Sequence, residues 1–167
     1  MDQQQLRALQ APLKQQYKDQ PASALITLKA EGALGEGVSC SVVTSRALIE
    51  AGLHPATGGS GLQACSGDML LQALVACAGV TVSAVATALG ITLRGGQVRA
   101  EGDLDFRGTL GVDKAAPVGF RQIRLSFDLD TDASEAEQAR LIELSERYCV
   151  VYQTLIHGTP VVTRPGA

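Results

Sequence analysis

The feature that most constrains the fold of this chain is a run of 25 residues without a charged side chain, from residue 69 to residue 93. A run of this length is long enough to cross a bilayer as a helix. Its Ala, Gly, Ser and Thr content, its Gln72 and its lack of an aromatic belt or basic flank favour a soluble protein instead. A helix that is apolar on nearly all sides is then expected to be central and buried on most of its surface.

The segments before and after this run predict strands. Residues 24–32, 38–45 and 46–54 alternate in polarity or are rich in β-branched residues, so we expect a three-stranded antiparallel meander. Ser66 is the N-cap candidate of the central helix, Asp68 lies in its first turn, and Gly90 is expected to end it. Residues 92–108 and 118–130 alternate with a period of two and predict two more strands.

A second long helix is predicted over residues 134–158, because Ser134 and Glu137 form a capping-box pattern and Gly158 ends the segment. Residues 159–164 predict a closing strand. The order β-β-β-α-β-β-α-β indicates an α+β fold, with an antiparallel sheet around a long buried central helix. Residues 3–18 are expected to form a short helix, so we assign residues 1–22 to an N-terminal helical extension and residues 23–167 to one domain.

Composition and charge argue against several classes of protein. The net charge is −3 and the 14 basic residues are scattered, which is not typical of a nucleic-acid-binding surface. No apolar leader segment is visible, so we expect a cytoplasmic protein with reduced cysteines. The cysteines lie at positions 40, 65, 77 and 149 and the histidines at 54 and 157, without the spacing of a metal site. We therefore expect no metal, no membrane and no nucleic acid.

The cysteines on the two predicted helices are compatible with more than one role. Cys149 shares a helical face with Ile142, Ser145 and Tyr152, so it is a candidate core residue. Cys77 is a candidate core residue for the same reason, because its predicted face is small and apolar. The residues that share this face with Cys77 are Leu70, Ala73, Val80 and Ala84.

The sequence around both cysteines resembles the OsmC/Ohr family of osmotically inducible and organic-hydroperoxide-resistance proteins. That family has a Pro-Glu pair at the start of a long central helix, with the Glu ten residues before a cysteine on that helix, and a later C-P-V-S-x-x-L segment. The matching stretches are SGDMLLQALVAC at residues 66–77 and CVVYQTL at residues 149–155. The resemblance covers roughly residues 23 to 164, so residues 23–167 are expected to form an OsmC-like domain.

The resemblance implies a peroxidase without metal or cofactor, built as an intertwined homodimer. Cys77 would be the peroxidatic thiolate, which becomes a sulfenic acid, and Cys149 the resolving thiol, which condenses with it to a disulfide. The implied substrate is an organic hydroperoxide, and the implied reductant is a dithiol of the lipoyl or thioredoxin type. The implied role is an antioxidant one, in the response to oxidative stress.

The sequence departs from the family pattern at three places. Gly67 stands where the family has Glu, and Asp68 is the neighbouring acid. The family Arg that holds the thiolate has no direct counterpart, which leaves Arg46 and His54 as candidates for the cation. Val150 stands where the family has Pro, so the second long helix is expected to continue without a break at this point.

Two other functions therefore remain open from the sequence. One is a non-catalytic OsmC-like protein that binds a small hydrophobic ligand at the dimer interface. The other is a protein in which all the cysteines are structural. Cys40 alternates with valines and is expected in the core, whereas Cys65 directly precedes the central helix, where the helix dipole lowers a thiol pKa.

Overall fold

We describe a computed structural model of the chain, which covers residues 2–5, 8, 11, 15, 19, 32–34, 39–43, 48–111 and 113–165. Most of the first predicted strand, residues 24–31, lies outside the described residues, and so does Arg46. The described residues among positions 3–18 are helical, in agreement with the predicted N-terminal helix. Two compact units are present: Met1–Leu6 with Ala73–Arg99 and Ser126–Ala167, and Arg7–Gln72 with Ala100–Leu125.

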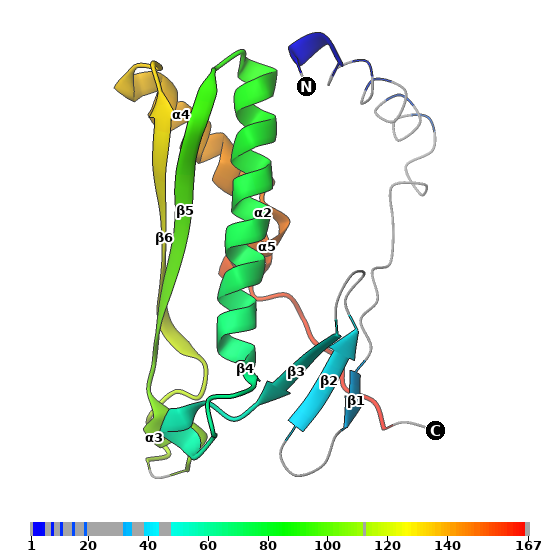
Figure 1. Cartoon of the computed structure of the whole chain (residues 1–167), viewed down its shortest axis with the longest axis vertical. Helices are drawn as coiled ribbons and strands as arrows, with labels where there is room; N and C mark the ends of the chain where they lie inside the picture. The colour runs from blue at the N-terminus through cyan, green and yellow to red at the C-terminus, as the bar shows by residue number, and fades with distance from the viewer. Residues whose placement is uncertain are drawn as a thin grey trace. The chain divides into compact units, whose positions relative to one another are not determined.

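The predicted antiparallel meander is confirmed for the described strands (Figure 1). Strand β1 (Gly32–Leu34) pairs antiparallel with β2 (Ser39–Val43), and β2 pairs antiparallel with β3 (Leu48–Gly52). A short strand that the sequence did not reveal, β4 (Ala64–Cys65), adds parallel to β3. Because β4 runs directly into the central helix, the sheet fixes the start of that helix.

The central helix α2 (Ser66–Leu89) has the predicted boundaries. Gly90 adopts a left-handed conformation, with φ of 75°, which glycine reaches without steric cost. The Ile91 amide donates to the Ala86 carbonyl (2.9 Å) and the Gly90 amide to the Thr87 carbonyl (3.2 Å), the pair of bonds of a Schellman motif. The helix end is therefore set by local sequence.

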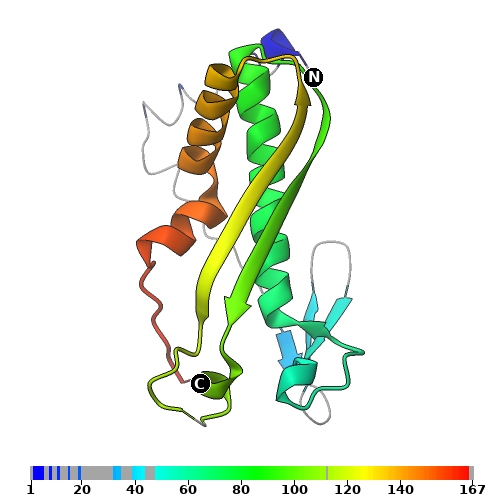
Figure 2. The ribbon, with the colours of Figure 1, turned by 90° about the vertical axis from the view of Figure 1, so that its left-hand side faces the viewer.

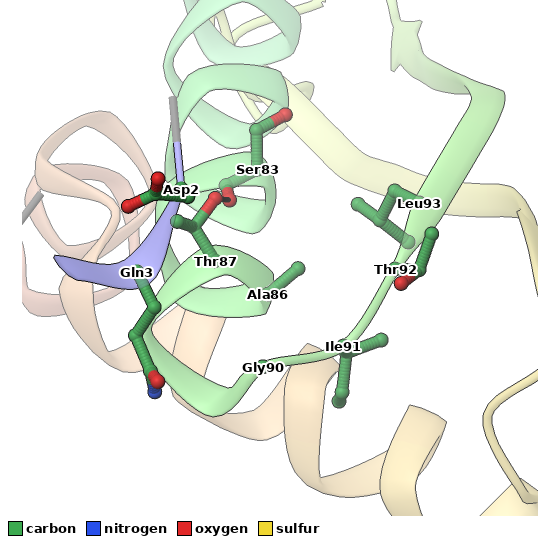
Figure 3. Close-up of a pocket in the computed structure, with 9 residues that line it drawn as sticks. All are labelled: Asp2, Gln3, Ser83, Ala86, Thr87, Gly90, Ile91, Thr92 and Leu93. Carbon is green, nitrogen blue, oxygen red and sulfur yellow. Dashed lines mark hydrogen bonds between the residues drawn. The ribbon is translucent and has the colours of Figure 1, made fainter. Parts of the chain in front are cut away.

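The same end of α2 also contacts the N-terminal turn. The Gln3 side-chain amide donates to the Ala88 carbonyl at 2.8 Å, which satisfies one of the carbonyls that a helix end leaves free. Figure 3 shows Asp2 and Gln3 beside this end of the helix, around a pocket of about 390 Å³. The pocket has no cysteine in its lining.

The core of the unit that contains the later part of α2 lies on one face of the helix. Val82 and Ala86 are buried against Leu141 of helix α4 (Glu135–Tyr148), and Figure 2 shows the two helices side by side. Val80 on α2 is 73% exposed. This chain therefore buries one face of α2 and leaves another uncovered, in contrast to the expected burial on most sides.

The two long predicted strands are confirmed as β5 (Leu93–Leu104) and β6 (Phe120–Thr131), which form a two-stranded sheet and run in opposite directions in Figure 1. They are linked through the short helix α3 (Phe106–Thr109). Along β6 the apolar side chains are partly buried and the polar ones exposed, as the period of two predicts. Arg94 binds Asp130 across the exposed face at 2.7 Å.

The second long helix differs from the prediction, because it is broken at Cys149. Helix α4 ends at Tyr148, and a separate helix, α5 (Val150–His157), follows. Cys149 has an extended backbone, with φ of −75° and ψ of 108°, and the Gln153 side-chain amide donates to the Glu146 carbonyl across the bend at 2.9 Å. The expectation of an unbroken helix, drawn from Val150 in place of Pro, was wrong.

The predicted closing strand at residues 159–164 was also wrong, because these residues have no regular secondary structure. Val161 and Val162 are 89% and 77% exposed, so their apolar side chains do not pack on either of the described sheets. A strand needs a neighbour for its backbone hydrogen bonds, and residues 159–164 have none within the described part of the chain.

Candidate functional site

Cys77 lies in the middle of α2 and is partly buried. The Thr81 hydroxyl, one turn later, donates to the Cys77 carbonyl at 2.7 Å and also lowers the pKa of the Cys77 thiol. Because the thiol is attached to a long regular helix, its position is fixed by the packing of that helix rather than by a loop.

Cys149 occupies the bend between α4 and α5 and is almost fully buried, with 1% of its surface exposed. The Cys149 side chain acts on the pKa of Cys77 and Cys77 acts on the pKa of Cys149, so the two side chains are neighbours, and both thiols are free. The structure therefore brings together the two cysteines that the sequence singled out, although 72 positions separate them.

The two thiols have opposite electrostatic environments. Burial raises the pKa of Cys77, but hydrogen bonds from the Val151 amide, the Cys149 side chain, the Val150 amide and the Thr81 hydroxyl outweigh this, and the net pKa is lowered. Burial raises the pKa of Cys149, and the neighbouring Cys77 sulfur adds to this increase. Cys77 is therefore the better thiolate, and Cys149 is the cysteine that stays protonated.

The amino end of α5 is a feature of this site that the sequence did not reveal. Its first two backbone amides, at Val150 and Val151, are among the groups that lower the pKa of Cys77. Amides at a helix start have no acceptor inside the helix and carry partial positive charge, so they favour a thiolate. Neither Gly nor Pro marks the helix break, and no local signal in the sequence predicted it.

Two of the other candidate residues line a pocket whose lining includes neither Cys77 nor Cys149. His54 and Asp68 line a pocket of about 350 Å³ together with Cys65. The Nδ1 atom of His54 accepts a hydrogen bond from the Ala56 amide at 3.0 Å, and the ring stacks on Phe106 with centroids 4.9 Å apart. Among the described groups that act most strongly on the pKa of Cys77, neither His54 nor Asp68 is present.

No group of three or more potential metal ligands occurs among the residues that the structure describes. Gly67 stands in place of the family Glu. A Cβ atom at this position would lie 3.5–3.6 Å from the Phe120 ring, the Cys65 sulfur and the Leu104 side chain. The start of α2 is thus lined by aromatic and apolar groups and a thiol.

The described geometry agrees with the comparisons to known proteins. A family model described as OsmC-like protein matches residues 59–164, a range that includes both cysteines and more than half of the chain. The chain belongs to the OsmC-like protein family. The family predicted from the two cysteine motifs is thus confirmed. No curated protein shows a significant match to this OsmC-like sequence.

Solved structures of the same family share the fold. An OsmC-like protein from Mycoplasma pneumoniae is 22% identical, with a TM-score of 0.66 over 79% of this chain and 89% of that one. An organic hydroperoxide resistance protein OsmC from Legionella pneumophila is 16% identical, with a TM-score of 0.59 over 80% and 91%. The organic hydroperoxide resistance protein OhrB of Bacillus subtilis is 16% identical, with a TM-score of 0.52 over 79% and 92%.

Helix α2 of this OsmC-like chain is long and apolar enough to cross a membrane, judged by its length and composition alone. Ser66–Leu89 is the one such helix among the described residues, with a mean hydropathy of 2.0 over its most apolar window. Leu74, Ala78, Val82 and Ala86 are nevertheless buried against the rest of the chain. Family membership and this buried face favour the core helix of a soluble protein.

Proposed function

We propose that this OsmC-like protein is a thiol-dependent peroxidase that reduces organic hydroperoxides through Cys77 and Cys149. The observation that carries the proposal is the juxtaposition of the two free thiols, with the pKa of Cys77 lowered and that of Cys149 raised. A peroxidatic cysteine must react as a thiolate, whereas its partner must remain available as a thiol. Relatives named organic hydroperoxide resistance proteins support the same function.

The first step is attack of the Cys77 thiolate on one oxygen of the hydroperoxide. A sulfur–oxygen bond forms, the oxygen–oxygen bond breaks, and the alcohol leaves after taking up a proton. Cys77 is then a sulfenic acid, oxidised by two electrons. The Cys149 sulfur next attacks the Cys77 sulfur, a disulfide forms, and the hydroxyl leaves as water with the proton that Cys149 released.

The cycle closes when an external dithiol supplies two electrons and two protons to the disulfide. We assign this role to a lipoyl-type or thioredoxin-type dithiol, because either one would regenerate both thiols by exchange. The net reaction converts one hydroperoxide and one dithiol into an alcohol, water and a disulfide. This activity would make the protein a cytoplasmic antioxidant in the response to oxidative stress.

A homodimer is part of the proposal. Leu70, Val80 and Leu89 of α2 are 38%, 73% and 45% exposed in the single chain, although the helix is mostly apolar. Exposed apolar surface on a long helix is typical of a contact between subunits. A second copy of the chain is therefore proposed to cover the open face of α2.

The test is consumption of cumene hydroperoxide, followed with xylenol orange, by wild type and by single cysteine variants. Cys77→Ser is expected to lose consumption, because it removes the nucleophile. Cys149→Ser is expected to consume one equivalent and stop at a sulfenic acid, which dimedone traps. Cys65→Ser is the matched control, a partly buried thiol that is not among the groups acting on Cys77, and should behave as wild type.

Equal consumption by wild type and Cys77→Ser would refute the assignment of the nucleophile. Absence of a dimedone adduct on Cys149→Ser would remove the resolving role of Cys149. If Cys77→Ser consumed peroxide as wild type does and Cys149→Ser gave no dimedone adduct, the second candidate would be favoured. That candidate is a non-catalytic member that binds a small hydrophobic ligand at the dimer interface. Gly67 in place of the family Glu is the observation that supports this alternative.

A further inference from the structure

The bend between α4 and α5 is bridged by Gln153, a partly buried residue in the first turn of α5. Its side-chain amide donates to the Glu146 carbonyl in the last turn of α4 at 2.9 Å. Its backbone amide donates to the Cys149 carbonyl at 2.9 Å. One residue therefore binds both the end of α4 and the cysteine at the bend.

The carbonyl that Gln153 binds is one that a continuous helix would use itself. In an α-helix the Glu146 carbonyl accepts from the backbone amide four residues later, which is that of Val150. The Cys149 amide still donates to the Ser145 carbonyl at 2.9 Å, so the helical pattern holds up to this residue. The extended backbone of Cys149 then turns the Val150 amide away from the axis of α4. The Gln153 side chain satisfies the carbonyl that this turn frees.

The break needs such a bond because it is not made by proline. Proline at position 150 would remove the amide and stop α4 by itself, but this position is Val. A sharp change of helix direction without proline depends on side chains that replace the lost backbone hydrogen bonds. The Gln153 side chain is such a replacement, and the bond it makes competes directly with the straight helix.

We propose that Gln153 is a positioning residue for the resolving step, because its bridge across the bend holds the Cys149 thiol beside Cys77. The inference deepens the proposed function and rests on it. Cys77 is fixed on α2, and each of the two cysteines acts on the pKa of the other. Straightening α4 into α5 would rotate the Cys149 side chain, whereas Cys77 could not follow it. The bent form is thus the one in which the disulfide can form.

The experiment measures how readily the Cys77–Cys149 disulfide forms in a buffer of reduced and oxidised glutathione. One oxidised glutathione takes two electrons and two protons from the cysteine pair and becomes two reduced glutathiones. The full chain is equilibrated and alkylated, and the disulfide is quantified by mass spectrometry. Gln153→Met keeps the length of the side chain but has no donor. It is expected to lower the equilibrium constant for the disulfide about five-fold, the factor that corresponds to one hydrogen bond.

Gln138 offers a matched control near the start of α4. It is also partly buried, and its side-chain amide donates to the Ala133 carbonyl at 2.8 Å. Gln138→Met removes a bond of the same kind away from the bend, so it should keep the wild-type equilibrium constant even where it lowers stability to urea. Gln153→Lys restores an N–H donor on a side chain of similar reach, and should return the constant to within about two-fold of wild type.

A wild-type equilibrium constant in folded Gln153→Met would overturn the proposal. An equal fall in Gln138→Met would overturn it as well, because the effect would then follow from a general loss of stability. Gln153→Ala is the second variant that removes the donor, with a residue that favours helices, and it should show the same fall as Gln153→Met. A wild-type constant in Gln153→Ala would assign the effect of Gln153→Met to the packing of methionine and refute the role of the bridge.

Glutathione takes the place of peroxide in this experiment, so the two proposals can fail separately. If the protein consumed no peroxide but the Gln153 variants still lowered the equilibrium constant, the proposed function would fail. The role of Gln153 in holding the two cysteines together would then stand. If peroxide consumption were normal and the constant did not move, the opposite would hold.

Discussion

Oxidation of Cys77 and Cys149 to a disulfide is expected to change the stability of the protein by an amount that the structure allows one to work out. The bond would join residues 72 positions apart. In the chain-entropy description, closing a loop of this length in the unfolded state stabilises the folded state by about 4 kcal/mol. The two cysteine side chains already act on each other's pKa, so they are neighbours in the reduced protein.

A second effect acts in the opposite direction. Oxidation removes the Cys77 thiolate, and with it the stabilisation by the groups that lower the pKa of Cys77. The net loss is taken as that of one hydrogen bond to a charged group, about 1.5–3 kcal/mol. The oxidised protein should therefore be more stable than the reduced protein by about 2 kcal/mol, which corresponds to a rise in Tm of about 4–8 °C for a chain of this size.

The assay is thermal and urea unfolding of the reduced and oxidised protein at one fixed protein concentration, because subunit association would make Tm concentration-dependent. Mass spectrometry should first verify the Cys77–Cys149 bond. Cys77→Ser should unfold identically with and without reductant, whereas Cys65→Ser should keep the wild-type difference. Equal stability of the two redox forms, or a less stable oxidised form, would refute the reasoning.

Three further predictions concern the fold. Leu141 is fully buried, so Leu141→Ala should lower the free energy of unfolding, measured in urea, by about 2–5 kcal/mol. The control is Leu110→Ala, at a side chain that is 56% exposed, which should change this free energy little. Ser134→Ala should cost about 1 kcal/mol in the same assay, because Ser134 caps α4, with Ser126→Ala as the control on an exposed strand position. The Ser134 side chain and amide lower the pKa of Glu137. The contribution of Glu137 is therefore present at neutral pH and is lost as the pH falls through this lowered pKa, so stability measured down to acid pH should fall less in Ser134→Ala.

The parts of the fold that could be predicted from sequence are those set by local chemistry. Gly90 marks the end of α2, because glycine readily adopts the left-handed conformation found just after the last helical residue. The Ser134–Glu137 capping box marks the start of α4. The alternation along β6 predicted a strand with one buried face. Each signal depends on neighbours within a few residues, and each is confirmed.

The break at Cys149 could not be predicted in this way. The residues around it read as one continuous helix, whereas Cys149 at the bend is almost fully buried and is a neighbour of Cys77, which lies 72 positions earlier. Residues 159–164 show the opposite case, in which a strand-like pattern has no partner for its hydrogen bonds within the described residues. The pairing of Cys77 with Cys149 came from the family resemblance, and the amides that act on Cys77 were missed.

The amino end of α5 has a consequence for the last step of the proposed cycle as well as for the first. Donors that stabilise the Cys77 thiolate stabilise the reduced protein, whereas the disulfide gains nothing from them. Stabilising the reduced form raises the reduction potential of the cysteine pair, as a low-pKa thiolate does in strongly oxidising disulfide proteins. The start of α5 would thus make the spent protein a better electron acceptor, and so widen the range of cellular dithiols able to regenerate it.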